Sequence, residues 1–452
     1  MLTVILMFSG CFSSKKDDSD SDSDNEIKIP TTGIELDKKA EQMLKKLDSY
    51  TESLSLTAVM TLNDIDFSVV STSVNQVMDQ QTDKYSSMTE TSITTTYDSE
   101  IITLDITDGF QDGYMYRNCY VNINQSKIKS PISKKDFLAF QDDLTEKEEK
   151  ELGNPTPNTS QLEHLEEGGY KAILKDFNKE FINNFFKSMV GEDLQLDTEI
   201  NALTVTITTT EDYVYKSIVL DFELNNPDDA KNTIDSISIS CDYSDINSTV
   251  INKYDISDYT EVSDIRDIYK VEDAIEKAKE SDHGKCTLTY DYENNRSPST
   301  NVHQEHTLRF NNENGLSYNY TIVQGTLTQI VLYEKNKVSV KNYTEGNLTN
   351  ETSANSTDDI QKNTVHSVID FAGFNQYLIS NIQLSKDEEN TYVIELFSND
   401  ISDTSMADSR IIYELKITIV KGTLTKYCYK NTYKDSNSPK VETIATYDWS
   451  AK

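Results

Sequence analysis

An eight-residue phrase occurs twice in this chain and sets its expected organisation. The stretch Phe177-Asn178-Lys179-Glu180-Phe181-Ile182-Asn183-Asn184 returns as Phe374-Asn375-Gln376-Tyr377-Leu378-Ile379-Ser380-Asn381, with four positions identical. In both copies the apolar residues recur at helical spacing, which predicts the start of an apolar-faced helix. The residues expected to form this apolar face are Phe177, Phe181, Ile182, Phe185, Phe374, Leu378 and Ile379.

The elements around the two copies predict a tandem repeat. Each half reads as a helix, several strands, the apolar helix and further strands. We expect a first domain over 34–265 and a second over 266–452. The first copy is longer upstream of its phrase, and a charged helix with its loop, about 133–166, accounts for the excess. An insertion of that kind at a loop adds little closure entropy.

Periodicity predicts where the elements lie. Ser133 is a good N-cap for the inserted helix, and Gly191 is a good C-cap for the apolar helix. A polar loop is expected over Asn347–Asp359, and a helix over Val365–Ile382. Other predicted helices and strands include Glu35–Tyr50, Ser53–Val70, Tyr114–Ile123, Ala202–Thr210, Ile234–Asp242, Val271–Glu280, His303–Phe310 and Leu327–Tyr333.

The N-terminus predicts export and a membrane anchor. Met1–Gly10 is apolar but too short to span a bilayer, so residues 1–11 read as a signal peptide. Phe8-Ser9-Gly10-Cys11 resembles a lipobox, in which the Cys is lipidated. The alternative is an ordinary secretion signal with an incidental Cys11. Residues 12–33 follow as an acidic segment that cannot bury enough apolar surface to fold, which suits a tether.

Charge excludes one large class of partner. The formal net charge is −35, and phosphate binding needs clustered Lys and Arg, so nucleic acid is not expected.

The run from Asp18 to Ser23 imitates the start of a calcium loop but lacks the Gly at its sixth position. We therefore expect an extracytoplasmic protein held at the membrane by Cys11, with no metal and no cofactor.

No residue pattern predicts catalysis. There is no Gly-rich phosphate loop and no Gly-x-Ser-x-Gly elbow. His303 and His306 are three apart in a predicted strand, so they point to opposite faces and cannot share a metal. Disulfides or free thiols are both open for the four later cysteines, which lie at Cys119, Cys241, Cys286 and Cys428. We expect no enzyme.

Nine sequons for N-glycosylation occur, about the number that chance gives in a chain so rich in Asn, Ser and Thr. Those between Asn342 and Asn355 fall in the predicted loop, where modification is sterically allowed. The sequons lie at Asn124, Asn158, Asn247, Asn295, Asn319, Asn342, Asn347, Asn350 and Asn355.

The element order resembles the lipoprotein-carrier superfamily of LolA, LolB and the mycobacterial LppX and LprG lipoproteins. The resemblance lies in the helix–Ser49-Tyr50–strand opening, the turn and strand from Asp112 to Tyr116, and the terminal strand at Tyr243-Ser244-Asp245. It implies an α+β fold class: two tandem repeats of a curved antiparallel sheet, a half-barrel, wrapped over helices. It also implies a lipid or apolar ligand held between sheet and helices.

Two functions follow as hypotheses. The first is a membrane-anchored lipoprotein that binds an apolar ligand or lipid under the sheet, with the apolar helix lining the pocket. The second is a structural or adhesive cell-envelope protein with an envelope protein partner, in which the same helix only fills the core. Whether the helices at Phe177 and Phe374 leave room decides between them.

Overall fold

The computed structural model describes most of the chain after the N-terminal segment. The described residues are 29–63, 65–98, 100–121, 124–153, 155–190, 196–227, 230–294, 297–313, 315–358, 360–362, 365, 374–396, 412–432 and 440–450. The predicted signal peptide, Cys11 and the tether as far as residue 28 lie outside them. The chain divides into two compact units, residues 1–122 with 131–256, and residues 123–130 with 257–452.

The fold is mostly β, so the predicted α+β class is wrong. In the described ranges the strands form two large sheets, of 12 and 11 strands, in which neighbours run antiparallel except for one short parallel pair. The α-helices whose two ends both lie in the described ranges are α2 (Gly33–Leu44), α3 (Lys134–Leu152), α4 (Lys179–Val190) and α5 (Arg266–Lys279). The long Thr-, Ile- and Val-rich runs of this sequence favour strands, which explains the excess of sheet over helix.

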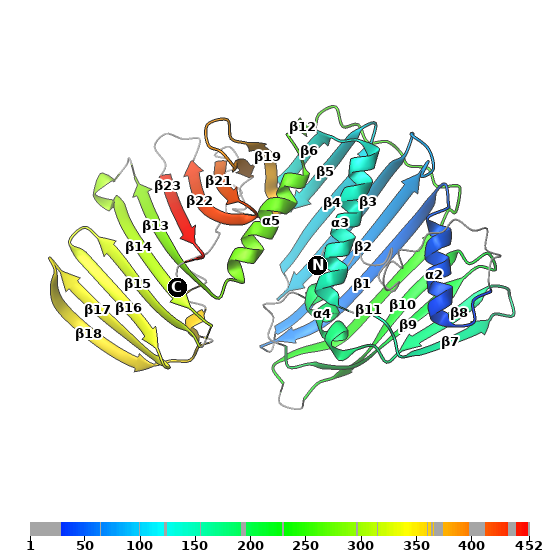
Figure 1. The fold of residues 1–452 in the computed structure, drawn as a ribbon, viewed down its shortest axis with the longest axis horizontal. Coiled ribbons are helices and arrows are strands. Elements are labelled where there is room, and N and C mark those ends of the chain that lie inside the picture. The colour runs from blue at the N-terminus through cyan, green and yellow to red at the C-terminus, as the bar shows by residue number, and fades with distance from the viewer. Residues whose placement is uncertain are drawn as a thin grey trace. The chain divides into compact units, whose positions relative to one another are not determined.

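The first unit contains ten strands in the order β5-β4-β3-β2-β1-β11-β10-β9-β8-β7, with α2, α3 and α4 drawn over it in Figure 1. Described strand bounds are β1 (Tyr50–Leu62), β2 (Ile65–Met78), β3 (Ser86–Tyr97), β4 (Glu100–Gln111), β5 (Tyr114–Val121), β7 (Thr159–His164), β8 (Tyr170–Lys175), β9 (Glu199–Thr209), β10 (Tyr215–Asn225) and β11 (Asn232–Ser244).

The second unit contains the sheet β18-β17-β16-β15-β14-β13-β23-β22-β21-β20-β19, together with the parallel pair β6 (Asn124–Pro131) and β12 (Thr260–Glu261). Helix α5 packs against β21 and β22. Described strand bounds are β13 (His283–Glu293), β14 (Val302–Asn311), β15 (Ser317–Gln324), β16 (Leu327–Glu334), β17 (Lys337–Thr344), β18 (Asn347–Asn355), β19 (Ile379–Leu384), β20 (Thr391–Leu396), β21 (Ile412–Val420), β22 (Thr423–Thr432) and β23 (Lys440–Asp448).

Both sheets share one strand order among the described strands. A helix precedes the strand at the middle, strands then add outward on one side, and the chain crosses to the far edge and returns. The first strand of each sheet therefore pairs with the last of its returning strands, β1 with β11 and β13 with β23. Many of these cross-strand pairs join residues far apart in sequence, so tertiary contacts hold the middle of each sheet together.

Alternation along β1 places one face of the first sheet in the core. Side chains at even positions from Tyr50 to Met60 are all buried, with exposed fractions of 8% and 1% at the two ends of that series. Helix α2 lies against β7 and β8 and buries Leu36, Ala40 and Leu44, a stripe at spacing four. The period of two in the strand and the helical stripe together specify this core.

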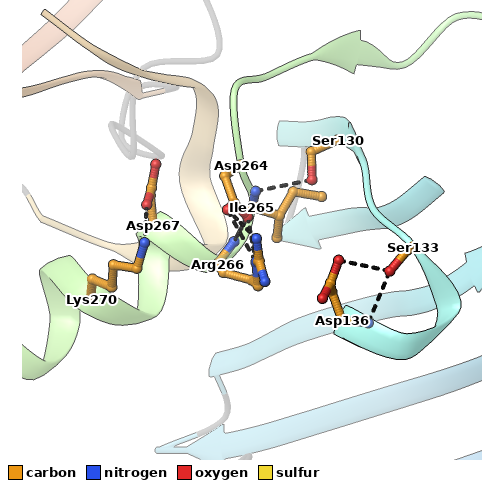
Figure 2. A network of polar contacts seen from close by, with 8 residues as sticks. All are labelled: Ser130, Ser133, Asp136, Asp264, Ile265, Arg266, Asp267 and Lys270. Carbon is orange, nitrogen blue, oxygen red and sulfur yellow. Dashed lines mark hydrogen bonds and ion pairs between the residues drawn. The ribbon is translucent and has the colours of Figure 1, made fainter. Parts of the chain in front are cut away.

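The predicted cap of the inserted helix is confirmed. Ser133 has extended backbone angles, and its Oγ accepts a 3.1 Å hydrogen bond from the Asp136 backbone N–H, as Figure 2 shows. The helix ends at Leu152 and is followed by Gly153, which lies at a φ of 86°. An N-cap hydroxyl satisfies one of the orphan donors of a helix start, and this signal is readable from sequence.

Polar contacts also fix the start of α5 within the second unit (Figure 2). The Ser130 Oγ accepts from the Ile265 backbone N–H at 3.1 Å, and the Asp264 carboxylate receives Arg266 Nη2 at 2.7 Å. One turn on, Lys270 Nζ lies 2.7 Å from the Asp267 carboxylate, which is buried. An acidic residue near a helix N-terminus also complements the helix dipole.

Two local predictions in the second half are wrong. The second phrase forms no helix over 374–381: a 3₁₀ turn at Gln376–Leu378 leads directly into β19. Most of the remaining predicted helix, including 366–373, lies outside the described residues. The predicted loop from Asn347 is strand β18, because pairing with β17 outweighs the low strand propensity of its Asn-rich sequence.

Candidate functional site

The apolar stripe of the first phrase begins at Phe177, two residues before α4, continues along that helix and is buried. Phe177, Phe181 and Phe185 are 7%, 2% and 2% exposed, and Ile182 is 3% exposed. Their rings follow one another along the helix, with centroids 5.8 Å apart for the first pair and 5.9 Å for the second. Phe185 then stacks on Phe222 of β10 at 6.2 Å. The stripe thus reaches the sheet through ring contacts.

The second phrase places its residues differently. Leu378 and Ile379 are 3% and 0% exposed at the start of β19, whereas Phe374 is only half-buried. These three residues belong to the second unit, whereas Phe177 and the three residues on α4 belong to the first. The phrase also precedes β9 in the first sheet but β19 in the second, so its copies do not hold equivalent places in the strand order.

A buried acid network in the first unit was not predicted. Glu52 of β1 is 5% exposed, and its Oε1 accepts hydrogen bonds from Tyr243 Oη at 3.0 Å and Cys241 Sγ at 3.3 Å. The Asn75 side-chain amide donates to Oε2 at 3.3 Å. All of these neighbours are uncharged, so the carboxyl group has donors but no cation among them.

A second buried carboxyl group, that of Asp37, is connected to Glu52 through the stacked rings of Tyr215 and Tyr243. Tyr215 Oη donates to Asp37 Oδ1 of α2 at 2.7 Å, and also lies 3.1 Å from the Asp37 carbonyl oxygen. The Tyr215 ring stacks on Tyr243, with centroids 5.1 Å apart. Tyr243 in turn bonds Glu52. We call Asp37, Tyr215, Tyr243, Glu52 and Cys241 the buried acid network.

Burial controls proton affinity throughout the buried acid network. Loss of solvation raises the pKa of Asp37 from 3.8 to about 6, against the opposing hydrogen bond from Tyr215. Burial also raises the pKa of Glu52, although three hydrogen-bond donors lower it. The Cys241 thiol has a raised pKa because it is buried beside Glu52. Burial thus disfavours the charged forms of these groups.

A readable signal for this network was missed. Glu52 falls in the alternating series of β1 that also carries Leu54 and Leu56, so the pattern alone places its side chain in the core. Asp37 precedes Ala40 and Leu44 by three and seven positions, which puts it on the buried face of α2. A carboxylate at an apolar position of a periodic run is the signal. The tyrosine partners of these carboxyl groups come from strands distant in the sequence, and no local pattern identifies them.

The histidines of β14 lie on opposite faces, as their spacing predicts. His303 Nδ1 is 2.6 Å from Asp291 Oδ1, and His306 Nδ1 is 2.6 Å from Tyr320 Oη. Across the described ranges, no group of three or more His, Cys, Asp or Glu side chains could hold a metal ion. In the same part of the chain, no helix has the length and apolarity that crossing a membrane requires.

The four cysteines after Cys11 are free thiols in the structure. Cys119 on β5 and Cys241 on β11 are separated by five steps in the sheet order, about 24 Å at the usual strand spacing. A disulfide requires Cα atoms within about 7 Å, so that pair cannot form without rearrangement. Cys286 lies opposite Tyr447 of β23, and Cys428 lies opposite Ile444 of the same strand. Cys286 and Cys428, on β13 and β22, are therefore two strands apart with β23 between them.

Comparisons with known proteins place the chain in no family. No protein-family model matches it, and no curated protein matches it. Solved structures align only loosely. Transferrin binding protein B (TbpB) from Neisseria meningitidis is 7% identical, with 89% of this chain and 77% of that one covered at a TM-score of 0.14.

Two other solved structures align no better. OccK3 (OpdO) of Pseudomonas aeruginosa is 5% identical, covers 88% of this chain and 95% of its own, and has a TM-score of 0.11. DNA polymerase III subunit beta from Borrelia burgdorferi is 8% identical, with 87% and 90% covered and a TM-score of 0.11. At these TM-scores the alignments support neither a shared fold nor a shared function.

Proposed function

We propose that this chain is a membrane-anchored extracytoplasmic lipoprotein that serves as a structural or adhesive platform of the cell envelope. Its lipid is attached at Cys11, and the acidic segment between Cys11 and the start of α2 tethers two β-sheet units. The observation that carries the platform function is the buried apolar stripe of α4, whose rings contact one another. Phe181, Phe185 and Phe222 occupy the space between helix and sheet with successive ring contacts.

A carrier of lipid would need something different at this place. An acyl chain binds in a cavity that apolar side chains line without filling. Here the stripe side chains make their contacts with one another and with the sheet, and Phe181 and Phe185 are each 2% exposed. The second phrase adds no matching helix, since Leu378 and Ile379 lead into a strand. These features favour a platform that binds a partner through its surface.

Native mass spectrometry of the protein, purified from its own membranes in mild detergent, tests this. We expect the mass of the processed, acylated chain with no additional lipid. A stoichiometric extra lipid, lost when Phe185 is replaced by a bulkier Trp that fills the space, would instead support the carrier function. Phe67→Trp on β2 is the matched control, because it makes the same change away from α4.

Anchoring is tested separately by fractionation. The Cys11→Ser variant should lose its acyl modification and leave the membrane fraction, because one lipidated residue is the proposed attachment. Cys428→Ser, a thiol change on β22, should stay in the membrane fraction. If Cys11→Ser remains membrane-bound without an acyl group, the anchor is wrong.

The duplication remains a prediction, and the shared strand order supports it better than the repeated phrase does. In both sheets the helix precedes the middle strand, and the last strand returns beside the first. A platform of two such units fits a role in which the second unit extends the reach of the first. Expression of residues 257–452 alone, followed by hydrogen exchange, would test whether the 11-stranded sheet of the second unit folds without β6.

A further inference from the structure

Sequons concentrate on one hairpin of the second unit. Of the nine sequons in the chain, four lie between Asn342 and Asn355. They belong to β17 and β18, which pair in antiparallel register from Lys337 with Asn355 to Thr344 with Asn347. The structure thus moves these sites from the expected loop onto a hairpin at the end of the sheet order.

Strand β18 presents its sequons to solvent. All nine of its residues, Asn347–Asn355, are exposed, so the Asn350 and Asn355 side chains and the Thr352 hydroxyl are accessible. Asn350 lies opposite Asn342, and Asn355 lies opposite Lys337. Since side chains alternate along a strand, Asn350 and Asn355, five positions apart, point to opposite faces of the sheet.

Three other sequons are engaged within the fold. Asn342 is half-buried on β17, and its Oδ1 accepts a 3.0 Å hydrogen bond from Gln329. Asn247 Oδ1 accepts from the Asp48 backbone N–H at 2.9 Å, and Asn158 Nδ2 donates to the Asp176 carbonyl oxygen at 2.9 Å. A bulky substituent on any of these amides would break a contact, whereas Asn350 and Asn355 project from the edge strand.

The same strand carries little of the usual protection of a sheet edge. Natural edges are blocked by Lys, Pro, bulges or charges that prevent another strand from pairing. Strand β18 contains one charged residue, Glu351, and this forms an ion pair with Lys341 at 3.4 Å. Its register with β17 shifts once, between Asn342 and Tyr343. A nine-residue exposed edge with so little charge needs another device to stay unpaired.

We propose that Asn350 and Asn355 carry N-linked glycans that shield the β18 edge. The proposal rests on the extracytoplasmic location proposed above, because the donor is a lipid-phosphate-linked oligosaccharide used by a membrane-bound transferase. The Asn Nδ2 forms a bond to the anomeric carbon of the first sugar, and the bond from that carbon to the donor phosphate breaks. The lipid phosphate leaves with the electron pair, and the amide proton passes to a base of the transferase.

Glycans at these two sites would protect the strand sterically. One would project from each face beside the edge, so an incoming strand would meet sugar before it reached the backbone N–H and C=O groups. The nearby Asn347 is a poorer acceptor, because the hydroxyl of its sequon residue Thr349 donates to the Asn342 carbonyl oxygen at 3.0 Å.

Peptide mass spectrometry of the full chain from its native membranes tests the proposal. Trypsin releases the peptide between Lys341 and Lys362, which contains all four sequons. Site-localising fragmentation should find sugar on Asn350 and Asn355 and none on Asn342. Thr352→Ala should remove the glycan from Asn350 alone, while Thr352→Ser, which keeps the sequon hydroxyl, should retain it.

Protease treatment of intact cells separates this inference from the proposed function. If the chain is cleaved from outside but the peptide carries no sugar, the glycans are wrong and the platform function stands. If the chain is protected from external protease and the peptide is bare, both are overturned. Sugar on Asn342 with none on Asn350 would also overturn the proposal, because Asn342 is half-buried whereas Asn350 is exposed.

Discussion

Glu52 and Tyr243 are direct cross-strand partners on β1 and β11, and their side chains are joined by a 3.0 Å hydrogen bond inside the core. The pair links the first strand of the sheet to the last of its returning strands. Its carboxyl group has a raised pKa, as does the nearby Asp37, so we expect the stability of the first unit to depend on pH.

Stability should fall as pH rises through the titration of Asp37. The pKa of this carboxyl group is higher in the folded chain than in the unfolded chain. Its contribution to stability is therefore complete at pH values below the unfolded pKa, and it is lost as the pH rises through the folded pKa. The window for Asp37 is therefore pH about 4 to 6, and a shift from 3.8 to about 6 corresponds to about 3 kcal/mol. Urea unfolding at several pH values between 3.5 and 7.5 should show the decline.

Asp37→Asn should flatten that pH dependence while keeping an oxygen that can accept from Tyr215. Asp66→Asn removes the same charge at an exposed position of β2 and should run parallel to the wild type. Equal flattening in both variants would assign the effect to net charge and not to the buried carboxyl. Glu52→Gln should change the curve in the same direction as Asp37→Asn, since burial raises its pKa too.

Phe185→Ala should destabilise the first unit by about 3 to 5 kcal/mol, because it removes a ring that is 2% exposed and leaves a cavity beside Phe222. The midpoint of chemical unfolding followed by circular dichroism measures this. Ile101→Ala on β4 is the control, since that side chain is 66% exposed and its loss should shift stability by less than about 0.5 kcal/mol. A small effect at Phe185 would mean that the stripe is loosely packed.

Gly169→Ala should be far more damaging than Gly113→Ala. Both glycines have positive φ, 95° and 82°, so each alanine carries a cost of about 1 to 2 kcal/mol in the left-handed region. At Gly169 a Cβ would also overlap the Thr209 carbonyl oxygen, whereas at Gly113 it would meet open space. Thermal unfolding should place the Gly169 variant well below the Gly113 variant, and similar midpoints would contradict the close approach.

Alkylation should distinguish the four thiols in the folded protein. Burial raises the pKa of Cys119 and Cys286 to about 12, and the thiolate is the reactive form. Iodoacetamide at pH 8 should therefore label the half-buried Cys428 first and the three buried thiols only after unfolding. Mass spectrometry counts the labels, with guanidinium-unfolded protein as the fully reactive reference. A label count of zero in guanidinium would reveal disulfides.

Local signals predicted the helices well where they had caps or a clear stripe. Ser133 is the N-cap of α3, and the apolar stripe that starts at Phe177 continues along α4. Both could be predicted because a cap hydroxyl and a period of 3.6 residues depend only on residues close together in the sequence. The alternation from Ser53 to Val70 was read as one strand, yet Asn63 has a φ of 52° and the chain turns there into β2. Alternation of apolar and polar residues indicates which face of a sheet a side chain lies on, but it does not show where the chain reverses direction.

Long-range pairing explains the remaining failures. The Asn347–Asn355 stretch has a loop-like composition and forms β18 only because β17 provides a ladder. The second phrase keeps four residues of the first, but its neighbours on β20 make it a strand. A short apolar string adopts the structure that its tertiary neighbours complete. The same holds for Glu52, whose location was readable but whose partners were not.

Pairing of the first strand with the last also governs when each unit can finish folding. Glu52 meets Tyr243 across 191 residues of chain, and Thr287 meets Thr446 across 159. Contacts of such high sequence separation slow folding, because loop entropy is lost before the ladder gains energy. A chain emerging residue by residue therefore cannot complete the central ladder until its final strand arrives. In the exported lipoprotein proposed above, this delay would keep each unit unfolded during passage through a translocation pore.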